Sequence, residues 1–435
     1  MMPMDWLYLM PWLLFGVLGV LIVIGIPIAM ALVLTATTLI LLDPRLTYWI
    51  MFQRMYNGMD SFVLLAVPLF LLAGNLMNAA RITDRLITLC MRLVGHFRGA
   101  LAHVNVLVSM LFAGVSGSST ADSAGVGTVL IPAMKREGYP VSFAVAVTAA
   151  SSVMGTIIPP SINMIVWGAL TNTSIAGLFL GGILPGVMIG AAQLLLNTRY
   201  VRRYDVPVRK RATLKELASS GKDGLLAAGI PIVIIGGITL GIVTPTEAAV
   251  IAVVYALALG FVVYRELDLT KLLNASTDTV RLCSLSLFSL VGAAIFGYLI
   301  SFYQIPPKLM AGVSITDPTV LLLVMTIVLL VIGTFMDALP AMAIMAPIFY
   351  PLAMSAGVHP VQFGVIGVMA LGLGLITPPY GLCLMISAKI GGIPLLKAMA
   401  TTMLYLGVML AVILVMILFP EFVLTIPRLI APDFI

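Results

Sequence analysis

The sequence predicts an all-α polytopic membrane protein built from two inverted repeats. Of its 435 residues, 61% are hydrophobic and only 9% are charged, and the mean hydropathy is +1.16. A soluble protein of this size would need far more charged surface. The other two observations are a repeat with an offset of 219 residues and an uneven distribution of Lys and Arg along the chain. The net charge of +6 is therefore interpreted as a topology signal rather than as a sign of nucleic-acid binding.

Ten apolar segments are long enough, or nearly long enough, to cross a bilayer, which takes about 20 helical residues. They are residues 6–24, 27–42, 61–80, 139–168, 175–197, 224–242, 246–264, 282–301, 361–388 and 398–419. Two further segments each have room for two half-helices joined by a polar tip, so we expect re-entrant hairpins there. The first apolar run has no Lys or Arg before it, which argues against a cleaved signal peptide and favours a retained helix.

The two halves of the chain correspond in detail. The offset of 219 residues places Pro159-Pro160 on Pro378-Pro379, Gly114 on Gly333 and Pro132 on Pro351. Each half then has five crossings, a hairpin and a helix broken at Pro-Pro, and the odd number of crossings inverts the second half relative to the first. The expected order is a first repeat over 1–198 (hairpin 99–134, broken helix 139–168), a basic cytoplasmic linker over 199–223 and a second repeat over 224–435 (hairpin 319–353, broken helix 361–388).

The distribution of basic residues supports this topology. With the linker in the cytoplasm, both termini lie outside, and 19 of the 23 Lys and Arg residues fall in inner segments against 4 in outer ones. The segment 81–98 is less clear, because it could span the membrane. Its four arginines and His96 favour an amphipathic arm in the membrane plane.

Four polar or proline-rich segments interrupt the apolar helices. They are two hairpin tips, Gly114–Ser119 and Gly333–Ala338, and two helix breaks, Gly155–Ser161 and Gly374–Gly381. Irregular backbone at membrane depth is tolerated only inside protein or beside water. Pro-Pro ends a helix, and so leaves carbonyl groups free on one side and amide groups free on the other. Free carbonyls with Ser and Thr hydroxyls suit Na⁺, and half-helix N-termini suit an anion.

We therefore expect two cation sites, each between a hairpin tip and a helix break, around one central anion site. The alternative is that these segments serve only close helix packing and kinking. No Lys or Arg is expected at the centre of a crossing, so an anion would be held by helix ends, hydroxyls and amides such as Asn163.

The few acidic residues near these segments have two interpretations each. Asp337 in the second tip is expected to ligate a cation, with helix capping as the alternative. Asp122 is expected to cap the first hairpin, with charge balance at the first site as the alternative, and Glu247 is expected to stabilise the start of a helix. No His, Asp and Glu spacing typical of a metal site or acid–base pair lies within a crossing, so we do not expect an enzyme.

Several motifs resemble the large membrane subunit of TRAP (tripartite ATP-independent periplasmic) transporters. They are FAGVSGSSTADSAGVGTVLIPAM, IIPPSINMIVWG, TPTEAA and LGLITPPYG, and the resemblance covers nearly the whole chain. It implies Na⁺-driven secondary import of an organic acid anion by an elevator mechanism. The implied location is the bacterial inner membrane, with both termini periplasmic. The implied partners are a periplasmic substrate-binding protein and a small four-helix membrane subunit, expected here as a separate chain.

The two tip-and-break pairs motivate at least two Na⁺ ions, and no organic cofactor is expected. The resemblance also carries site residues over by matching motif. The expected Na⁺ ligands are Ser116, Ser118, Ser119, Gly155 and Pro159 at the first site and Gly333, Asp337 and Thr377 at the second. The expected substrate residues are Ser119, Thr120, Pro160, Ser161, Asn163, Thr334 and Pro379. One departure is Asn75, where many relatives have Glu.

The leading hypothesis is import of a C4-dicarboxylate or a related carboxylate delivered by the binding protein. A stand-alone ion-coupled anion transporter of the same broad architecture is the alternative. An ion channel built on re-entrant loops is a third, although one chain with two inverted copies does not by itself supply the oligomeric symmetry that channels use.

Overall fold

The structure is a computed structural model that describes residues 4–204, 206–312 and 317–432. All the regular structure in these ranges is helical. The helices of the first half are α1 (Met4–Val23), α2 (Ile28–Leu42), α3 (Tyr48–Met59), η1 (Phe62–Leu65), α4 (Ala66–Ala79), α5 (Ile82–Val94), α6 (Ala100–Ser116), α7 (Ser119–Arg136), α8 (Val141–Ser152), η2 (Val153–Thr156), α9 (Ile162–Thr171) and α10 (Ile175–Val201). Those of the second half are α11 (Leu214–Thr239), α12 (Pro245–Ala258), η3 (Leu259–Val263), α13 (Leu269–Phe302), α14 (Ile305–Gly312), α15 (Pro318–Phe335), α16 (Ala338–Ser355), α17 (Pro360–Gly374), α18 (Leu382–Gly391), α19 (Leu395–Leu418) and α20 (Glu421–Ile430).

Seven helical segments within the described ranges are long and apolar enough to cross a bilayer by themselves, and several shorter apolar helices accompany them. The seven are Phe62–Ala79, Ile175–Val201, Pro245–Val263, Leu269–Phe302, Pro318–Phe335, Ala338–Ser355 and Leu395–Leu418. The prediction of an all-α polytopic membrane protein is therefore confirmed.

Helix boundaries differ from the sequence-based expectation at two places. α10 continues to Val201 and α11 begins at Leu214, so the non-helical connection is shorter than the basic segment 199–223. α13 begins at Leu269 rather than at residue 282, and its 34 residues span about 51 Å. That length exceeds the bilayer core of about 30 Å, so the polar end of α13, which carries Asp278 and Arg281, extends beyond the apolar run.

The arginine-rich segment 81–98 contains a short amphipathic helix, α5. Its 13 residues span about 20 Å, which is less than the thickness of the hydrocarbon core. Ile82, Leu86 and Cys90 are buried on one face of it, against α6 and α11. This helix therefore packs by one apolar face and is too short to cross the membrane.

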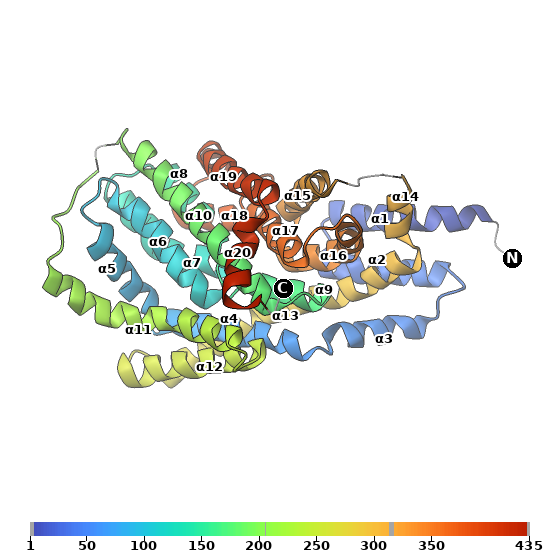
Figure 1. The fold of residues 1–435 in the computed structure, drawn as a ribbon, viewed down its shortest axis with the longest axis horizontal. Helices are drawn as coiled ribbons and strands as arrows, with labels where there is room; N and C mark the ends of the chain where they lie inside the picture. The colour runs from blue at the N-terminus through green and yellow to red at the C-terminus, as the bar shows by residue number, and fades with distance from the viewer. Residues whose placement is uncertain (1–3, 205, 313–316, 433–435) are drawn as a thin grey trace.

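The helices of the two halves pack in corresponding pairs (Figure 1). α6 and α7 pack on α8 in the first half, and α15 and α16 pack on α17 in the second. The second part of each broken helix packs on the hairpin of the other half, because α18 contacts α7 and α9 contacts α16. In the same way α8 contacts α19, and α17 contacts α10. The two tips and the two breaks are thus held within one group of helices.

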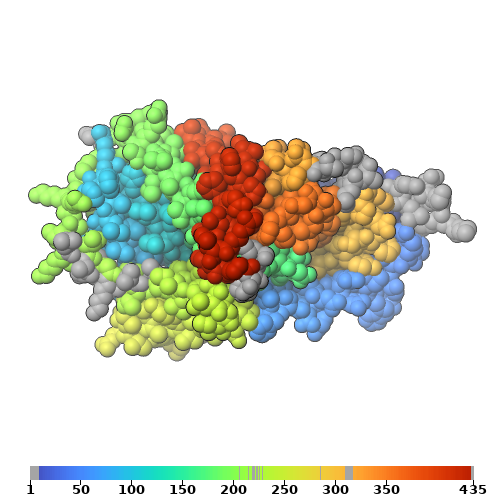
Figure 2. All heavy atoms as spheres, viewed as in Figure 1, coloured from blue at the N-terminus to red at the C-terminus, as the bar shows by residue number. Residues whose placement is uncertain are grey.

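A second group of helices surrounds this one. The long helix α13 packs against α2, α3 and α4, and α12 packs on α4. α11 packs against α5 and α12, at the left and lower edge of Figure 1. On the face shown in Figure 2, the C-terminal helix α20 lies across the middle of the molecule, in contact with α10 and α17.

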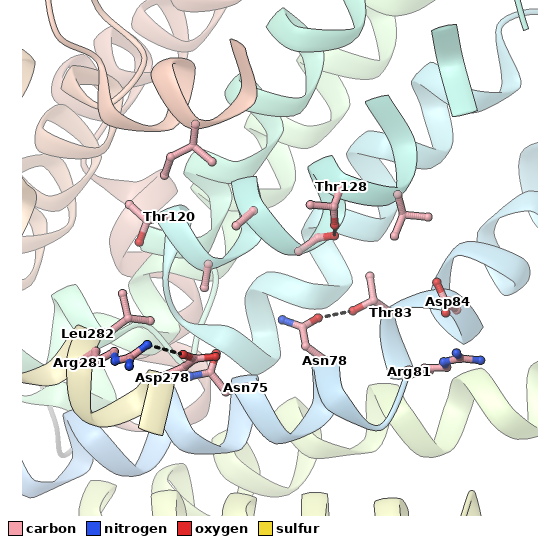
Figure 3. A pocket seen from close by; sticks show the side chains of 15 residues that line it. Asn75, Asn78, Arg81, Thr83, Asp84, Thr120, Thr128, Asp278, Arg281 and Leu282 are labelled. Atoms are coloured by element: carbon pink, nitrogen blue, oxygen red, sulfur yellow. Dashed lines mark hydrogen bonds and ion pairs between the residues drawn. The ribbon is translucent and has the colours of Figure 1, made fainter. Parts of the chain in front are cut away.

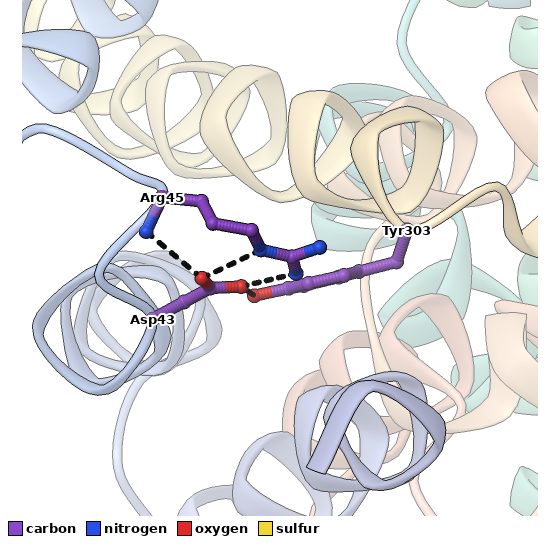
Figure 4. A network of polar contacts seen from close by, with 3 residues as sticks. All are labelled: Asp43, Arg45 and Tyr303. Atoms are coloured by element: carbon purple, nitrogen blue, oxygen red, sulfur yellow. Dashed lines mark hydrogen bonds and ion pairs between the residues drawn. The ribbon is translucent and has the colours of Figure 1, made fainter. Parts of the chain in front are cut away.

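A buried carboxylate ties α2 to the end of α13 (Figure 4). Asp43 is only 3% exposed, and its oxygens accept hydrogen bonds from Arg45 Nε (2.9 Å), Arg45 Nη2 (2.5 Å) and the Tyr303 hydroxyl (3.2 Å). The Arg45 guanidinium also lies 5.1 Å from the centroid of the Phe302 ring. The hydrogen bonds from Arg45 hold the pKa of the Asp43 carboxyl below its ordinary value, although burial opposes them.

We predict that Arg45→Gln lowers the apparent melting temperature at pH 7, by the equivalent of about 1–2 kcal/mol, because it leaves a buried carboxylate without its cation. Folding lowers the pKa of Asp43, so the ionised carboxylate stabilises the folded protein at pH values above the pKa that Asp43 has in the unfolded chain. This stabilisation is lost as the pH falls through the pKa of Asp43 in the folded protein. The difference between variant and wild type should therefore shrink below about pH 4.

The matched control is Arg54→Gln, because Arg54 stacks on Tyr298 at 4.3 Å and makes no carboxylate pair within the described residues. Its effect should not depend on pH in this range. A constant difference between Arg45→Gln and wild type from pH 7 to pH 3.5 would contradict the assignment.

Candidate functional site

The first hairpin tip docks on the first helix break. α6 ends at Ser116, and Gly117 turns the chain with a φ of +61°. Ser118 then caps α7 by accepting a hydrogen bond from Ala121 N at 3.5 Å. The Gly117 carbonyl accepts a hydrogen bond from Ile162 N at 3.2 Å, which links the tip to the start of α9. A Cβ atom at Gly117 would lie 2.9 Å from the Pro160 carbonyl oxygen, so this close approach requires glycine.

The first break carries a chain of internal hydrogen bonds. Pro159-Pro160 is a cis peptide bond, and Ser161 caps α9 by accepting a hydrogen bond from Met164 N at 3.3 Å. The Ser161 hydroxyl in turn donates to the Thr156 carbonyl at 2.5 Å. Gly155 lies against the tip, since a Cβ atom there would be 3.0 Å from Ser119 N.

Asp122 does not cap the first hairpin, so that prediction is wrong. Ser118 provides the cap, because it lies at the position before α7 where a side-chain oxygen can reach the first free amides. Asp122 is fully buried one turn further on and accepts a hydrogen bond from the Ser116 hydroxyl. Its Oδ2 atom has no hydrogen-bond partner among the described residues and faces Gly155.

The second tip docks on the second break in a comparable way. Asp337 caps α16, because its Oδ1 accepts a hydrogen bond from Ala338 N at 2.8 Å. The Thr334 carbonyl accepts a hydrogen bond from Gly381 N at 3.4 Å. Gly333 and Gly374 bring the backbones of α15 and α17 into contact, since a Cβ atom on Gly374 would lie 2.4 Å from the Gly333 carbonyl carbon. The capping interpretation of Asp337 is thus confirmed, while cation ligation stays a prediction.

Both tips and the first part of both breaks meet at one central cavity of about 60 Å³. This volume is about the share of two water molecules in the liquid, so it suits ions or water rather than an organic acid. α4 and α13 close it from the side. Its lining is Leu71, Gly117, Ser118, Ser119, Thr120, Thr156, Ile162, Asn163, Leu282, Ser286, Asp337, Leu339 and Leu375. No Lys or Arg lines the cavity in the part of the chain that the structure describes.

The structure brings some of the predicted site residues to this cavity and leaves others beside it. Those that line it are Ser118, Ser119, Thr120, Asn163 and Asp337. The others, Ser116, Gly155, Pro159, Pro160, Ser161, Gly333, Thr334 and Thr377, belong to the surrounding tips and breaks. Pro379 is exposed on the second break and does not line the cavity.

Two further polar residues line the cavity, Thr156 and Ser286. Thr156 lies in the break Gly155–Ser161, which is expected from its sequence to offer ligands, whereas Ser286 was missed. The Thr156 hydroxyl donates to the Val153 carbonyl at 2.7 Å. Thr156 also faces α17 of the second half, because a Cβ atom on Gly372 would lie 2.6 Å from Thr156 Oγ1. Ser286 comes from the middle of α13, where no motif marks it.

A larger cavity of about 650 Å³ adjoins the central one (Figure 3). Thr120 and Leu282 line both cavities. The larger cavity lies between α4, α5 and α13 on one side and α7 and α18 on the other. Its polar lining is Asn75, Asn78, Arg81, Thr83, Asp84, Thr120, Thr128, Asp278 and Arg281. Asn75 donates to Thr279 Oγ1 at 2.9 Å, and Arg281 and Asp278 are 3.8 Å apart.

A second cavity, of about 570 Å³, is related to this one by the offset of 219 residues. It lies between α3 and α13 on one side and α9 and α16 on the other. Asn75, Asn78, Ala124 and Thr128 of the first cavity correspond to Ala294, Gly297, Ala343 and Pro347 of the second. The second cavity shares no lining residue with the central one.

The fold and these sites define a helical membrane protein with the fold of a known transporter. The crystal structure of the YdaH transporter of Alcanivorax borkumensis superposes with a TM-score of 0.59 at 16% sequence identity, over 84% of this chain and 86% of that one. At this identity the likeness concerns the fold alone.

Sequence comparison identifies the family. The family model described as "Tripartite ATP-independent periplasmic transporter, DctM component" matches residues 15–422. The chain therefore belongs to the DctM family of TRAP transporter large permease subunits.

Two relatives illustrate the range of that family. The sialic acid TRAP transporter large permease protein SiaM of Vibrio cholerae is 36% identical over 95% of this chain and 97% of its own length. The C4-dicarboxylate TRAP transporter large permease protein DctM of Pseudomonas aeruginosa is 35% identical over 86% of this chain and 88% of its own. The resemblance seen in the sequence motifs is thus confirmed.

We predict that Gly155→Ala destabilises the protein by about 1–3 kcal/mol. The added Cβ would lie 2.5 Å from Asp122 Oδ2 and 3.0 Å from Ser119 N, so the first tip would have to move off the break. The measurement is the apparent melting temperature in detergent. The control, Gly407→Ala in α19, meets nothing within 4 Å and should be neutral or slightly stabilising. Equal melting temperatures for the two variants would show that the tip and break are not tightly docked.

Proposed function

We propose that this chain is the membrane subunit for Na⁺-coupled import of a small organic acid anion, a C4-dicarboxylate or a related carboxylate. The observation that carries the proposal is the convergence of both hairpin tips and both breaks on one cavity whose lining includes hydroxyl, carboxylate and amide groups. The oxygen atoms of such a lining can ligate alkali cations, and its amide and hydroxyl groups can donate hydrogen bonds to an anion. In the described part of the chain, the lining has no fixed positive charge that could hold the anion alone.

The residues around each tip suit a desolvated Na⁺ ion. At the first site the donor groups are the hydroxyls of Ser116, Ser118 and Ser119 and the carbonyls from Gly155 to Pro159. The buried carboxylate of Asp122, with one oxygen unpaired, supports a positive charge nearby. At the second site the donors are the backbone of Gly333, the Asp337 carboxylate and Thr377. Two such sites motivate a coupling of at least two Na⁺ per substrate.

The substrate would occupy the region where the central cavity joins the larger one. The central cavity is too small for an organic acid, whereas the adjoining one, at about 650 Å³, is large enough. Thr120 lies where they meet, with Ser119 and Asn163 behind it, and Arg81 and Arg281 lie further out. The names of the two relatives, a sialic acid and a C4-dicarboxylate transporter, support a carboxylate as the recognised group.

The proposed mechanism is an elevator built on two inverted repeats. The hairpins and broken helices pack on one another across the halves, while α2, α3, α4, α12 and α13 form a separate group. Movement of the first group against the second would open the two offset-related cavities in turn. The 19 to 4 distribution of basic residues supports a cytoplasmic linker and periplasmic termini in the bacterial inner membrane. Membership of the family supports a periplasmic binding protein and a small membrane subunit as partners.

A first test requires no substrate. We predict that Na⁺ raises the melting temperature of the wild type relative to K⁺ at equal ionic strength, and that Asp337→Asn reduces this rise. Na⁺ at ten times its dissociation constant would contribute about 1.4 kcal/mol. Asparagine can still cap α16, so the variant removes mainly the charge.

The control for this test is Asp317→Asn. Asp317 caps α15 by accepting hydrogen bonds from Thr319 N and Val320 N, but it is exposed at the end of the helix. Its variant should keep the full Na⁺ response. An equal Na⁺ response in wild type and Asp337→Asn would exclude Asp337 as a ligand. No Na⁺ response in the wild type would contradict the proposed Na⁺ sites altogether.

The second test is uptake into proteoliposomes that contain this chain and the small subunit. We predict accumulation of a C4-dicarboxylate or sialic acid against its gradient, only when the matching binding protein is outside, with at least two radiolabelled Na⁺ taken up per acid. Uptake without the binding protein would favour a stand-alone transporter. Equilibration without accumulation would indicate a channel, and a ratio of one Na⁺ or none would contradict the proposed coupling.

A further inference from the structure

A groove of about 870 Å³ lies on the molecular surface between α5, α6 and α10, away from the central cavity. Its walls are mainly apolar and include Val94, Phe97, Leu107 and Leu195. Phe97 is 53% exposed and Leu195 is 72% exposed, which for residues of a membrane protein places apolar surface toward lipid. None of its lining residues lines the other cavities described above.

One end of the groove is basic. Arg98 lies just before the start of α6, and Arg202 lies just after the end of α10, so both are at the same edge of the membrane. Arg98 Nη2 donates a hydrogen bond to the Tyr204 carbonyl at 2.9 Å, which orients its side chain. No carboxylate pairs with either arginine within residues 4–204, 206–312 and 317–432.

Neighbouring arginines are paired differently. Arg209 pairs with Glu137 at 2.7 Å, and Arg92 pairs with Glu216 at 3.2 Å. Glu137 and Glu216 therefore pair with other arginines, and the groove has two positive charges with no carboxylate partner among the described residues. Such a site attracts an anion that also has an apolar part, because the anionic group can bind the arginines while the apolar part fills the groove.

The length of the groove matches one leaflet. Along α10 its lining runs from Arg202 back to Ala191, and eleven residues of helix rise about 16 Å. Half of a hydrocarbon core of about 30 Å is about 15 Å. A ligand with an anionic group at the arginines and an alkyl chain along Leu195 and Ala191 would therefore end near the bilayer midplane.

We propose that this groove binds an anionic phospholipid, with its phosphate between Arg98 and Arg202 and one acyl chain along α6 and α10. The occupied groove would connect the α5 arm, through Val94 and Phe97, to the first hairpin helix α6. Because α6 leads directly to the first tip, the lipid would stabilise the packing of the hairpin on its surroundings.

The test uses native mass spectrometry and thermal unfolding of the full chain with its small subunit, titrated with phosphatidylglycerol or phosphatidylcholine. We predict retained phosphatidylglycerol adducts and a raised melting temperature for the wild type, and affinity roughly tenfold lower for the double variant Arg98→Gln, Arg202→Gln. The control double variant Lys135→Gln, Arg136→Gln removes two exposed charges at the end of α7, outside the groove, and should behave as the wild type.

A second variant tests the apolar part without changing charge. Leu195→Trp places a large ring over the groove from a lipid-exposed position, so it should reduce phosphatidylglycerol binding while protein yield is unchanged. Equal binding of the two lipids, or equal phosphatidylglycerol binding by the arginine and control variants, would overturn the proposal. Stabilisation by inorganic phosphate alone, or loss of the small subunit from either groove variant, would also overturn it, because the occupant would then be a free anion or the partner subunit.

Discussion

Backbone polar groups at membrane depth need partners from the protein, and this requirement determines how the tips and breaks are arranged. Each Pro-Pro break interrupts a helix and each tip interrupts a hairpin, so all four segments expose amides and carbonyls. Each tip closes on its own break by a backbone hydrogen bond, from Ile162 N to the Gly117 carbonyl and from Gly381 N to the Thr334 carbonyl. The close glycine contacts at Gly155 and Gly374 allow this approach. The central cavity exists because these two docked pairs meet.

Two carboxyl groups lie at or beside that cavity. Asp122 is fully buried behind the first tip, and Asp337 caps the helix that follows the second. These carboxylates are not equivalent by the repeat, since the offset relates Asp337 to Ser118 and Asp122 to Ala341. An anionic substrate placed beside two carboxylates in a low-dielectric region is repelled unless cations accompany it. Charge balance therefore supports the proposed coupling to Na⁺, as the oxygen ligands around the tips do.

The sequence was sufficient to predict the helical membrane fold, because hydropathy and the repeat are both carried by many residues. It also predicted where the chain breaks, since Pro159-Pro160 and Pro378-Pro379 cannot continue a helix. It could not predict that Ser118 rather than Asp122 caps α7, because both offer a side-chain oxygen close to the helix start and the sequence does not give the first helical residue. Nor could it place Ser286, which comes to the cavity from the middle of α13 through tertiary packing. Pro379 is the opposite case: its motif predicted a substrate residue, but Pro379 is exposed and does not line the cavity.

The repeat also produces an asymmetry that concerns transport direction. The two offset-related cavities are formed by corresponding helices, but their chemistry differs. Asn75, Asn78 and Thr128 of one correspond to Ala294, Gly297 and Pro347 of the other. The first cavity offers an anion amide and hydroxyl donors and the guanidinium groups of Arg81 and Arg281, although Asp84 and Asp278 also line it. Within the part of the chain that the structure describes, the second cavity has one guanidinium group in its lining, that of Arg54 beside Tyr298. Side chains at matched positions thus make the two offset-related cavities unequal for an anion.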